Sequence, residues 1–275
     1  MKLETPKISA ARGGSSAEKR SVERLLAPLD HLADTSAYFL SKSFGKFDSG
    51  GQTYSMPRYI YFGPRGGGDT IRLGIFATLH GDEPEGALGL LRFAELLEAK
   101  REIAKGYALF IYPVCNTTGF EDGTRESRSG KDLNREFWRN SPEPEVAFLQ
   151  TEIWTHAFHG IVTLHSDDTS NGLYGFANGS VLSEHLLEPA LREAEKVLPR
   201  NRRRQIDGFA AKRGIIYESY DGVLRAPPQM KSPPFEVTLE TPQHAPLHRQ
   251  AEAFAVALET MLTEYRYLIA VAQNI

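Results

Sequence analysis

The sequence predicts an α/β fold in which helices flank a largely parallel or mixed sheet. Three apolar runs of strand length, residues 71–79, 107–115 and 160–164, alternate with segments whose apolar residues recur at helical spacing. These runs are apolar along almost their whole length, which is typical of strands buried on both faces. The chain has 275 residues, which is enough for a sizeable core, and we expect one domain over residues 17–275.

The N-terminal part begins with a polar segment, residues 1–16, which we expect to be mobile. Apolar residues near helical spacing then predict a helix over residues 17–40. Residues 42–51 are polar and contain glycines, so a loop is expected there. Tyrosine and isoleucine enrichment predicts a strand over residues 54–62, and three glycines within residues 64–69 predict a turn before the next strand.

The later elements follow the same alternation. Helical periodicity predicts helices over residues 84–100, 143–158, 182–198 and about 247–272. Pro84 fits the preference of proline for the first turn of a helix. A last strand is expected over residues 235–239. The charged stretch 117–140 is too long for a simple connector, which marks it as a functional segment.

Charge and composition exclude several classes of protein. The formal net charge is −3, so the chain has no broad basic field and no nucleic-acid partner is expected. No apolar stretch reaches the roughly 18 residues that a membrane-spanning helix needs, and the polar start lacks the apolar segment of a signal peptide. The single cysteine, Cys115, excludes a disulfide framework. We therefore expect a soluble cytoplasmic protein without a membrane partner.

Polar side chains follow the ends of the expected strands, where open α/β sheets bind their ligands. His80 and Glu83 follow one strand, and His165 follows a second. Glu240 follows the last strand. Two imidazoles and one carboxylate are a common catalytic zinc set. The pair His80 and Glu83 alone is equally compatible with a helix cap, so the convergence of all four residues carries the argument.

Four segments together resemble the zinc metallocarboxypeptidase family. Three of them are residues 80–83, 112–119 and 235–240, and the closest match is the run Asp132-Leu133-Asn134-Arg135 within residues 125–137. The resemblance is to carboxypeptidase A-like enzymes, in particular their small bacterial murein peptide amidase-like branch. It extends to the related succinylglutamate desuccinylase/aspartoacylase group.

The resemblance implies a three-layer α/β/α sandwich around a mixed, mostly parallel eight-stranded sheet. It also implies one Zn²⁺ ion held by His80, Glu83 and His165, where zinc would make hydroxide available at neutral pH. Glu240 would act as the general base and acid, and Arg125 would stabilise the developing oxyanion. Glu236 lies on the same strand face as Glu240, so periodicity alone leaves both glutamates open.

Further residues are implied to bind the substrate. Asn134 and Arg135 would hold its free carboxylate, and Arg128, the alternative to Arg125 by position, would contact it as well. The family also uses a mobile tyrosine before the catalytic glutamate, for which Tyr217 and Tyr220 are both candidates. A basic side chain in the specificity pocket, such as Arg213 or Arg225, would suit an acidic substrate.

The expected activity is therefore that of a zinc-dependent hydrolase acting on a small peptide or acyl amino acid. The first expectation is a carboxypeptidase or peptide amidase, because the residues after Glu240 look helical whereas the deacylases usually add a β-rich domain there. The alternative is an N-acyl amino acid deacylase of the succinylglutamate desuccinylase/aspartoacylase type. A second alternative is an inactive relative that binds peptides or carboxylates.

Overall fold

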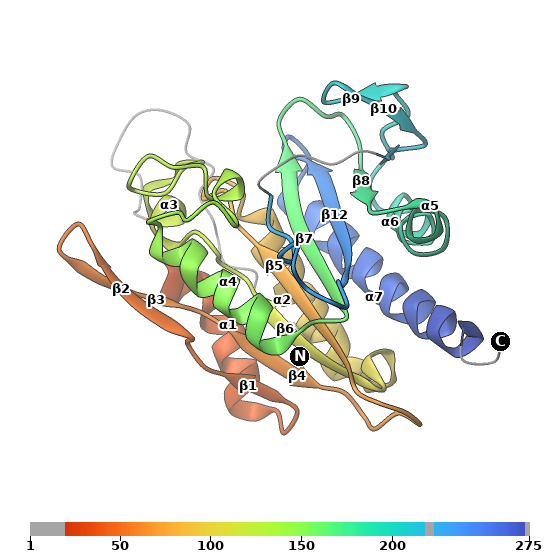
Figure 1. Ribbon diagram of the computed structural model, residues 1–275, viewed down its shortest axis with the longest axis horizontal. Coiled ribbons are helices and arrows are strands. Elements are labelled where there is room, and N and C mark those ends of the chain that lie inside the picture. Colours follow the sequence, from red (N-terminus) through yellow and green to blue (C-terminus); the bar gives the residue numbers. More distant parts are fainter. Residues whose placement is uncertain (1–19, 218–222, 273–275) are drawn as a thin grey trace.

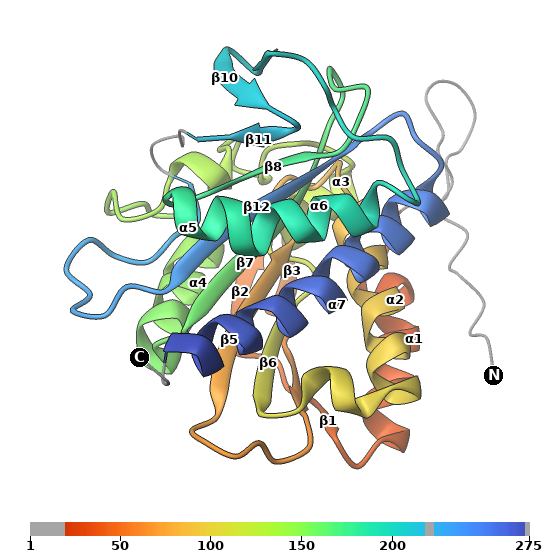
Figure 2. The same cartoon turned by 90° about the vertical axis from the view of Figure 1, so that its right-hand side faces the viewer.

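The computed structural model describes residues 20–217 and 223–272. The segment 1–16, which we expected to be mobile, lies outside these ranges. Within them, a central sheet is covered by helices on both faces (Figures 1 and 2). The α/β/α arrangement expected from the sequence is thereby confirmed.

The helices differ greatly in length, and the terminal one is the longest. They are α1 (Val22–Thr35), α2 (Glu85–Ala99), α3 (Thr117–Asp122), α4 (Pro144–His156), α5 (Ser180–Leu182), α6 (Glu188–Ala194) and α7 (Leu247–Ala272). Two short 3-10 turns and one π-helical turn supplement them, namely η1 (Arg101–Ala104), η2 (Leu133–Arg135) and η3 (Ser183–Leu187).

The strands are short at the edges of the sheet and long at its centre. They are β1 (Phe39–Ser41), β2 (Gly45–Ser49), β3 (Gln52–Met56), β4 (Tyr59–Phe62), β5 (Ile71–Ala77), β6 (Tyr107–Tyr112), β7 (Gly160–Asp167), β8 (Tyr174–Ala177), β9 (Gln205–Ile206), β10 (Phe209–Lys212), β11 (Ile215–Ile216) and β12 (Phe235–Pro242).

The large sheet has the order β1-β4-β6-β5-β7-β12-β8-β11-β10-β9. Its centre, β6-β5-β7-β12, is parallel, and antiparallel pairs predominate toward both edges. The described residues therefore form a ten-stranded sheet rather than the eight-stranded one that the resemblance implied. Because β5, β7 and β12 are parallel neighbours, their carboxyl ends meet at one edge, where ligands of such sheets bind.

Side chains alternate between the two faces of the sheet, as the period of two in a strand requires. On β5, Leu73 and Ile75 belong to the core shared with α1, α2, α6 and α7, whereas Phe76 belongs to the core shared with α4. Within the second core, Phe76 stacks on Tyr112 at 4.4 Å between ring centroids. Among the described helices, none is long and apolar enough to cross a lipid bilayer.

One hairpin lies where a loop was expected from the sequence, and a second lies in a segment for which no element was expected. Residues 42–51 form most of the hairpin β2–β3, whose turn is Gly50-Gly51 with φ of 58° and 75°. Such a two-residue turn with positive φ matches the twist of a hairpin, so the glycines indicated a hairpin rather than a loop. The hairpin β9–β10 turns in the same way at Asp207-Gly208, with φ of 49° and 83°.

Candidate active site

The first two candidate metal ligands lie on the turn between β5 and α2. Thr78 directly after β5 has φ of 53°, a left-handed conformation that is strained for a β-branched residue and is typically found at functional sites. A Cβ atom at Gly81 would lie 2.0 Å from the carbonyl carbon of Gly119, so only glycine allows the turn to pack this closely on α3. The turn thereby holds His80 and Glu83 in place.

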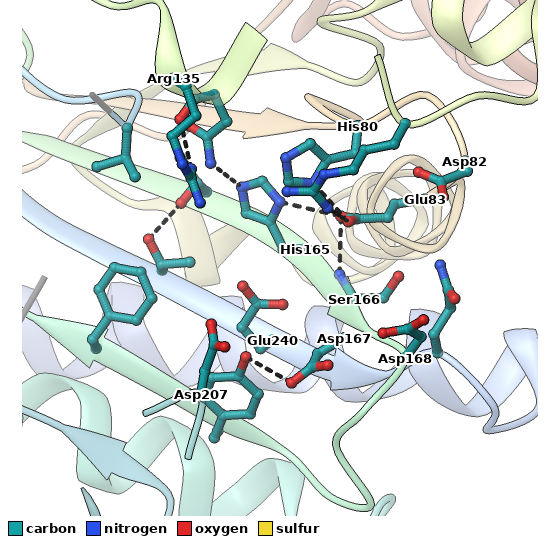
Figure 3. A pocket seen from close by; sticks show the side chains of 18 residues that line it. His80, Asp82, Glu83, Arg135, His165, Ser166, Asp167, Asp168, Asp207 and Glu240 are labelled. Atoms are coloured by element: carbon teal, nitrogen blue, oxygen red, sulfur yellow. Dashed lines mark hydrogen bonds and ion pairs between the residues drawn. The ribbon is translucent and has the colours of Figure 1, made fainter. Parts of the chain in front are cut away.

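His80, Glu83 and His165 converge on one buried point, although His165 lies on β7 and the other two lie on the turn after β5 (Figure 3). The His80 Nδ1 atom lies 2.6 Å from Glu83 Oε1, and His165 Nδ1 lies 3.1 Å from Glu83 Oε2. One ligand atom from each of the three residues lies within 4.8 Å of the others. The distances, the burial and the His₂Glu donor set all fit a divalent ion such as zinc.

Neighbouring groups fix the orientation of these ligands. The Ser166 backbone N–H donates to Glu83 Oε2 at 3.1 Å, and the Ser166 hydroxyl donates to Glu85. Asp132 Oδ1 lies 3.3 Å from the other ring nitrogen of His80. Carboxylates placed behind a histidine ligand in this way set its tautomer and raise its basicity.

The charges of the three ligands are coupled. Burial by itself raises the pKa of Glu83, but the two imidazoles beside it lower that pKa overall. Burial by itself lowers the pKa of His80, but the carboxylates of Glu83 and Asp132 outweigh burial and raise it to about 9. A cation would have to displace the proton held between His80 and Glu83, so metal binding at this point is coupled to proton release.

Glu240 lies on β12 directly opposite His165 on β7, so the two side chains share one face of the sheet. Burial raises the pKa of Glu240 well above its usual range, and the nearby carboxylates of Glu83 and Asp167 raise it further. A carboxyl group of raised pKa beside a metal site has the property that a general base needs near neutral pH.

These residues open into a single cavity of about 300 Å³. Arg125 lines it, with its Nη1 atom 3.6 Å from Glu83 Oε1 and its Nη2 atom 3.1 Å from Asp132. Asn134 and Arg135 line it on η2, and the Asn134 amide lies 3.5 Å from His165 Nε2. The remaining lining residues are Asp82, Thr163, Ser166, Asp167, Asp168, Tyr174, Phe176, Asp207, Val223, Thr238 and Gln243.

Some predicted residues lie elsewhere. Arg128 donates to both oxygens of Asp122 and to the Tyr54 hydroxyl, which directs it toward the β2–β3 hairpin and away from the cavity. The Glu236 carboxylate accepts hydrogen bonds from the Asn178 side chain and from a backbone N–H, and it does not line the cavity.

Of the two candidate tyrosines and the two candidate basic residues, none of those described lines the cavity. Tyr217 is described, is half exposed and does not line the cavity. Tyr220 lies outside the described residues. Neither Arg213 nor Arg225 lines the cavity, so the suggested basic specificity residues do not reach it.

The acidic residues opposite the arginines were not among the site residues predicted from the sequence. Asp167 and Asp168 directly follow Ser166 in the sequence, so their place at a strand end was the available signal. Asp207 gave only the signal of an Asp-Gly turn. Burial raises the pKa of the Tyr174 phenol, and the carboxylates of Glu240, Asp167 and Asp207 raise it further. The Tyr174 hydroxyl donates to Asp167 Oδ2 at 3.0 Å.

One known family matches part of the chain. The model of the succinylglutamate desuccinylase/aspartoacylase catalytic domain matches residues 69–197, a little under half of the chain. This range contains the three candidate metal ligands and ends before Glu240. A search of curated proteins found no match.

Solved structures of metallopeptidases share the fold. A Shewanella amazonensis SB2B protein assigned as a metallopeptidase has 22% identity and a TM-score of 0.73, with 88% of this chain and 92% of that chain covered. A Burkholderia cenocepacia metallo-carboxypeptidase has 16% identity and a TM-score of 0.70, with coverages of 91% and 70%.

A third structure contains a ligand. It is the Pseudomonas aeruginosa metallo-carboxypeptidase in complex with (2-guanidinoethylmercapto)succinic acid, with 19% identity, a TM-score of 0.65 and coverages of 90% and 69%. Together, the matches support a metal-dependent hydrolase. The chain has the metallo-carboxypeptidase fold, and its residues 69–197 match the desuccinylase/aspartoacylase catalytic-domain model, which confirms the resemblance to the zinc carboxypeptidase-like family.

Proposed function

We propose that the protein is a zinc-dependent hydrolase that cleaves the amide bond next to a free carboxylate in a small peptide. The observation that carries this proposal is that the three candidate metal ligands, Glu240 and the pair Asn134 and Arg135 all line one cavity. The cavity therefore combines a site for a metal, a site for a base and a site for an anion.

His80, Glu83 and His165 would hold the zinc ion, through both Nδ1 atoms and the carboxylate. The ion, when bound, supplies Lewis acidity, which lowers the pKa of water and polarises a carbonyl group. Glu240 would accept a proton from the attacking water and return it to the leaving nitrogen. The raised pKa of Glu240 favours its protonated form, which is the form that returns the proton to the leaving nitrogen.

The arginines would act on two different parts of the substrate. Arg125 lies 3.6 Å from a metal ligand, close enough to stabilise negative charge that develops on the carbonyl oxygen. Arg135 and Asn134 would bind the terminal carboxylate, for which the planar guanidinium is suited because it can contact both oxygens. Holding the carboxylate fixes which amide bond reaches the reacting groups.

The ligand of the Pseudomonas aeruginosa carboxypeptidase is a succinic acid derivative, so it carries carboxyl groups. The same chemical group is what Asn134 and Arg135 would hold here. This similarity supports a substrate with a free carboxylate.

The second candidate is an N-acyl amino acid deacylase, and the family model over residues 69–197 favours it. Its substrate also presents a free carboxylate beside an amide bond, so the same residues would carry the same roles. The two candidates differ in the group on the other side of the amide, which is a peptide in one and a small acyl group in the other.

The experiment is a parallel assay of the zinc-loaded full chain. The substrates are a dipeptide with a free carboxylate, the same dipeptide as its C-terminal amide, a γ-D-glutamyl-diaminopimelate peptide and N-acyl amino acids. We expect hydrolysis of free-carboxylate peptides and none of the amide. Hydrolysis of the N-acyl amino acids alone would establish the deacylase, and hydrolysis of none of them with zinc bound would overturn the proposal.

A further inference from the structure

The cavity has walls of opposite charge. Arg135 lies on one side, on the η2 turn, whereas Asp167 and Asp207 lie beyond Glu240 on the other side (Figure 3). Arg125 belongs to the side of Arg135, since it pairs with Asp132 directly before η2. Among the described lining residues, these two arginines are the only lysine or arginine side chains. The proposed function uses the positive wall and leaves the negative wall without a role.

Asp167 is held rigidly at the carboxyl end of β7. Its Oδ1 atom accepts hydrogen bonds from the Thr169 backbone N–H and hydroxyl, both at 2.7 Å, and its Oδ2 atom accepts from the Tyr174 hydroxyl at 3.0 Å. These three donors hold the carboxylate in one orientation. The negative charge is therefore fixed at the edge of the cavity, with Tyr174 as part of the same wall.

Asp207 reaches the same wall from a separate element. It occupies the first turn position of the β9–β10 hairpin with φ of 49°, and Gly208 follows with φ of 83°. Aspartate and asparagine tolerate this conformation better than most residues. The carboxylate is solvent-exposed yet lines the cavity, so the hairpin carries a charge to the entrance rather than burying it.

We propose that the substrate carries a cationic group, an amine or a guanidinium, which lies between Asp167 and Asp207 while its carboxylate lies at Arg135. This inference rests on the proposed function for the role of Arg135. A cation between two carboxylates gains charge-assisted hydrogen bonds, whereas an acidic group would meet like charges there. The arrangement therefore points away from the acidic substrate that Arg213 or Arg225 would have suited.

The test measures binding of free amino acids, so it does not depend on turnover. The zinc-loaded full chain is titrated with arginine, with citrulline, which has the same length and a neutral urea group, and with glutamate, using isothermal titration calorimetry. We expect arginine to bind about tenfold more tightly than citrulline, the size of a net charged hydrogen bond. Glutamate is expected to bind more weakly than either.

Two variants locate the effect. Asp207→Asn keeps a residue that tolerates the turn conformation, and it should reduce the preference for arginine over citrulline to about threefold or less. Asp167→Asn should reduce it as well. The matched control is Asp69→Asn. Asp69 is exposed and precedes β5, at the amino-terminal ends of the central strands and away from the cavity, so this variant should leave the preference unchanged.

The outcomes separate this inference from the proposed function. Equal affinities for arginine and citrulline, tighter binding of glutamate, or no saturable binding of arginine in the millimolar range would overturn the inference. So would an unchanged preference in Asp207→Asn and Asp167→Asn. Any of these results could occur while free-carboxylate peptides are still hydrolysed. In that case the proposed function stands and the inference about a cationic group is wrong. Preferential binding of arginine, without hydrolysis of any of the assayed substrates, would support the inference and contradict the proposed hydrolase function.

Discussion

Glu240 lies directly opposite His165 in the parallel ladder between β12 and β7. Paired residues in neighbouring strands project to the same side of the sheet at close spacing. The proposed general base and a candidate metal ligand are thus fixed relative to each other by backbone hydrogen bonds rather than by a flexible loop. Such rigidity is what positioned catalytic groups require.

The first prediction follows from that pair. Glu240→Gln removes the proton acceptor but keeps the shape of the side chain, so we expect kcat to fall by about 10²–10⁴-fold while zinc is retained. Steady-state kinetics and elemental analysis on the same sample measure the two effects. Glu236→Gln is the control, because Glu236 lies two pleats away and bonds Asn178 instead. A larger loss in Glu236→Gln than in Glu240→Gln would assign the base to Glu236.

The second prediction concerns the metal. His165→Ala removes one of three ligands, and loss of a ligand should cost more than the roughly 10–100-fold in metal affinity that supporting residues typically contribute. In the unaltered protein, zinc at 100 times its Kd should stabilise the fold by about 2.7 kcal/mol, visible as a rise in Tm. The variant should show no such rise. His185→Ala, an exposed histidine on η3, should behave like the unaltered protein.

The third prediction tests the carboxylate anchor. Arg135→Ala should lower kcat/KM for a free-carboxylate substrate by about 10–100-fold, the size of one or two charged hydrogen bonds. Its zinc content should not change, because Arg135 lies outside the three-ligand cluster. Arg128→Ala is the comparison, since Arg128 bonds Asp122 and Tyr54 outside the cavity. An equal loss of kcat/KM in both variants would contradict the anchor role.

The sequence allowed much of the site to be predicted because parallel strands place their carboxyl ends together. His80 and Glu83 follow β5, whereas His165 and Glu240 lie near the carboxyl ends of β7 and β12, and these three strands are adjacent in the sheet. The order of the strands in the sheet could not be derived from the spacing of residues along the chain. The strand that follows β7 in the sequence is β8, yet β12 lies between them in the sheet. Only the resemblance to a known family indicated that the strands carrying these residues are neighbours.

The parts that were missed depend on contacts between distant segments. Arg128 lies in the same charged loop as Arg125, but the β2–β3 hairpin supplies Tyr54 as a partner and draws Arg128 away. Asp207 reaches the cavity only because a short hairpin extends the sheet beyond β8. Both effects require knowing where a hairpin lies in space, which periodicity within one segment does not provide.

The last prediction concerns pH and stability away from the cavity. Glu145 at the start of α4 is 1% exposed, and burial raises its pKa from 4.5 to about 7. Since the pKa in the folded state exceeds that in the unfolded state, the protonated form is favoured by folding. The contribution of the Glu145 carboxyl to the stability of the fold is fully present below about pH 4.5 and is lost as the pH rises through 7.

Glu145→Gln replaces the group by a permanently neutral one of the same shape, which can still accept the hydrogen bond from the Thr118 hydroxyl. At pH 8 the variant should therefore be more stable than the unaltered protein, by on the order of 1–3 kcal/mol, and the difference should shrink toward pH 5. Urea unfolding at both pH values measures it. Glu184→Gln, an exposed position, should show no pH-dependent difference. A destabilised Glu145→Gln at pH 8 would mean that the buried carboxylate is ionised and held by partners.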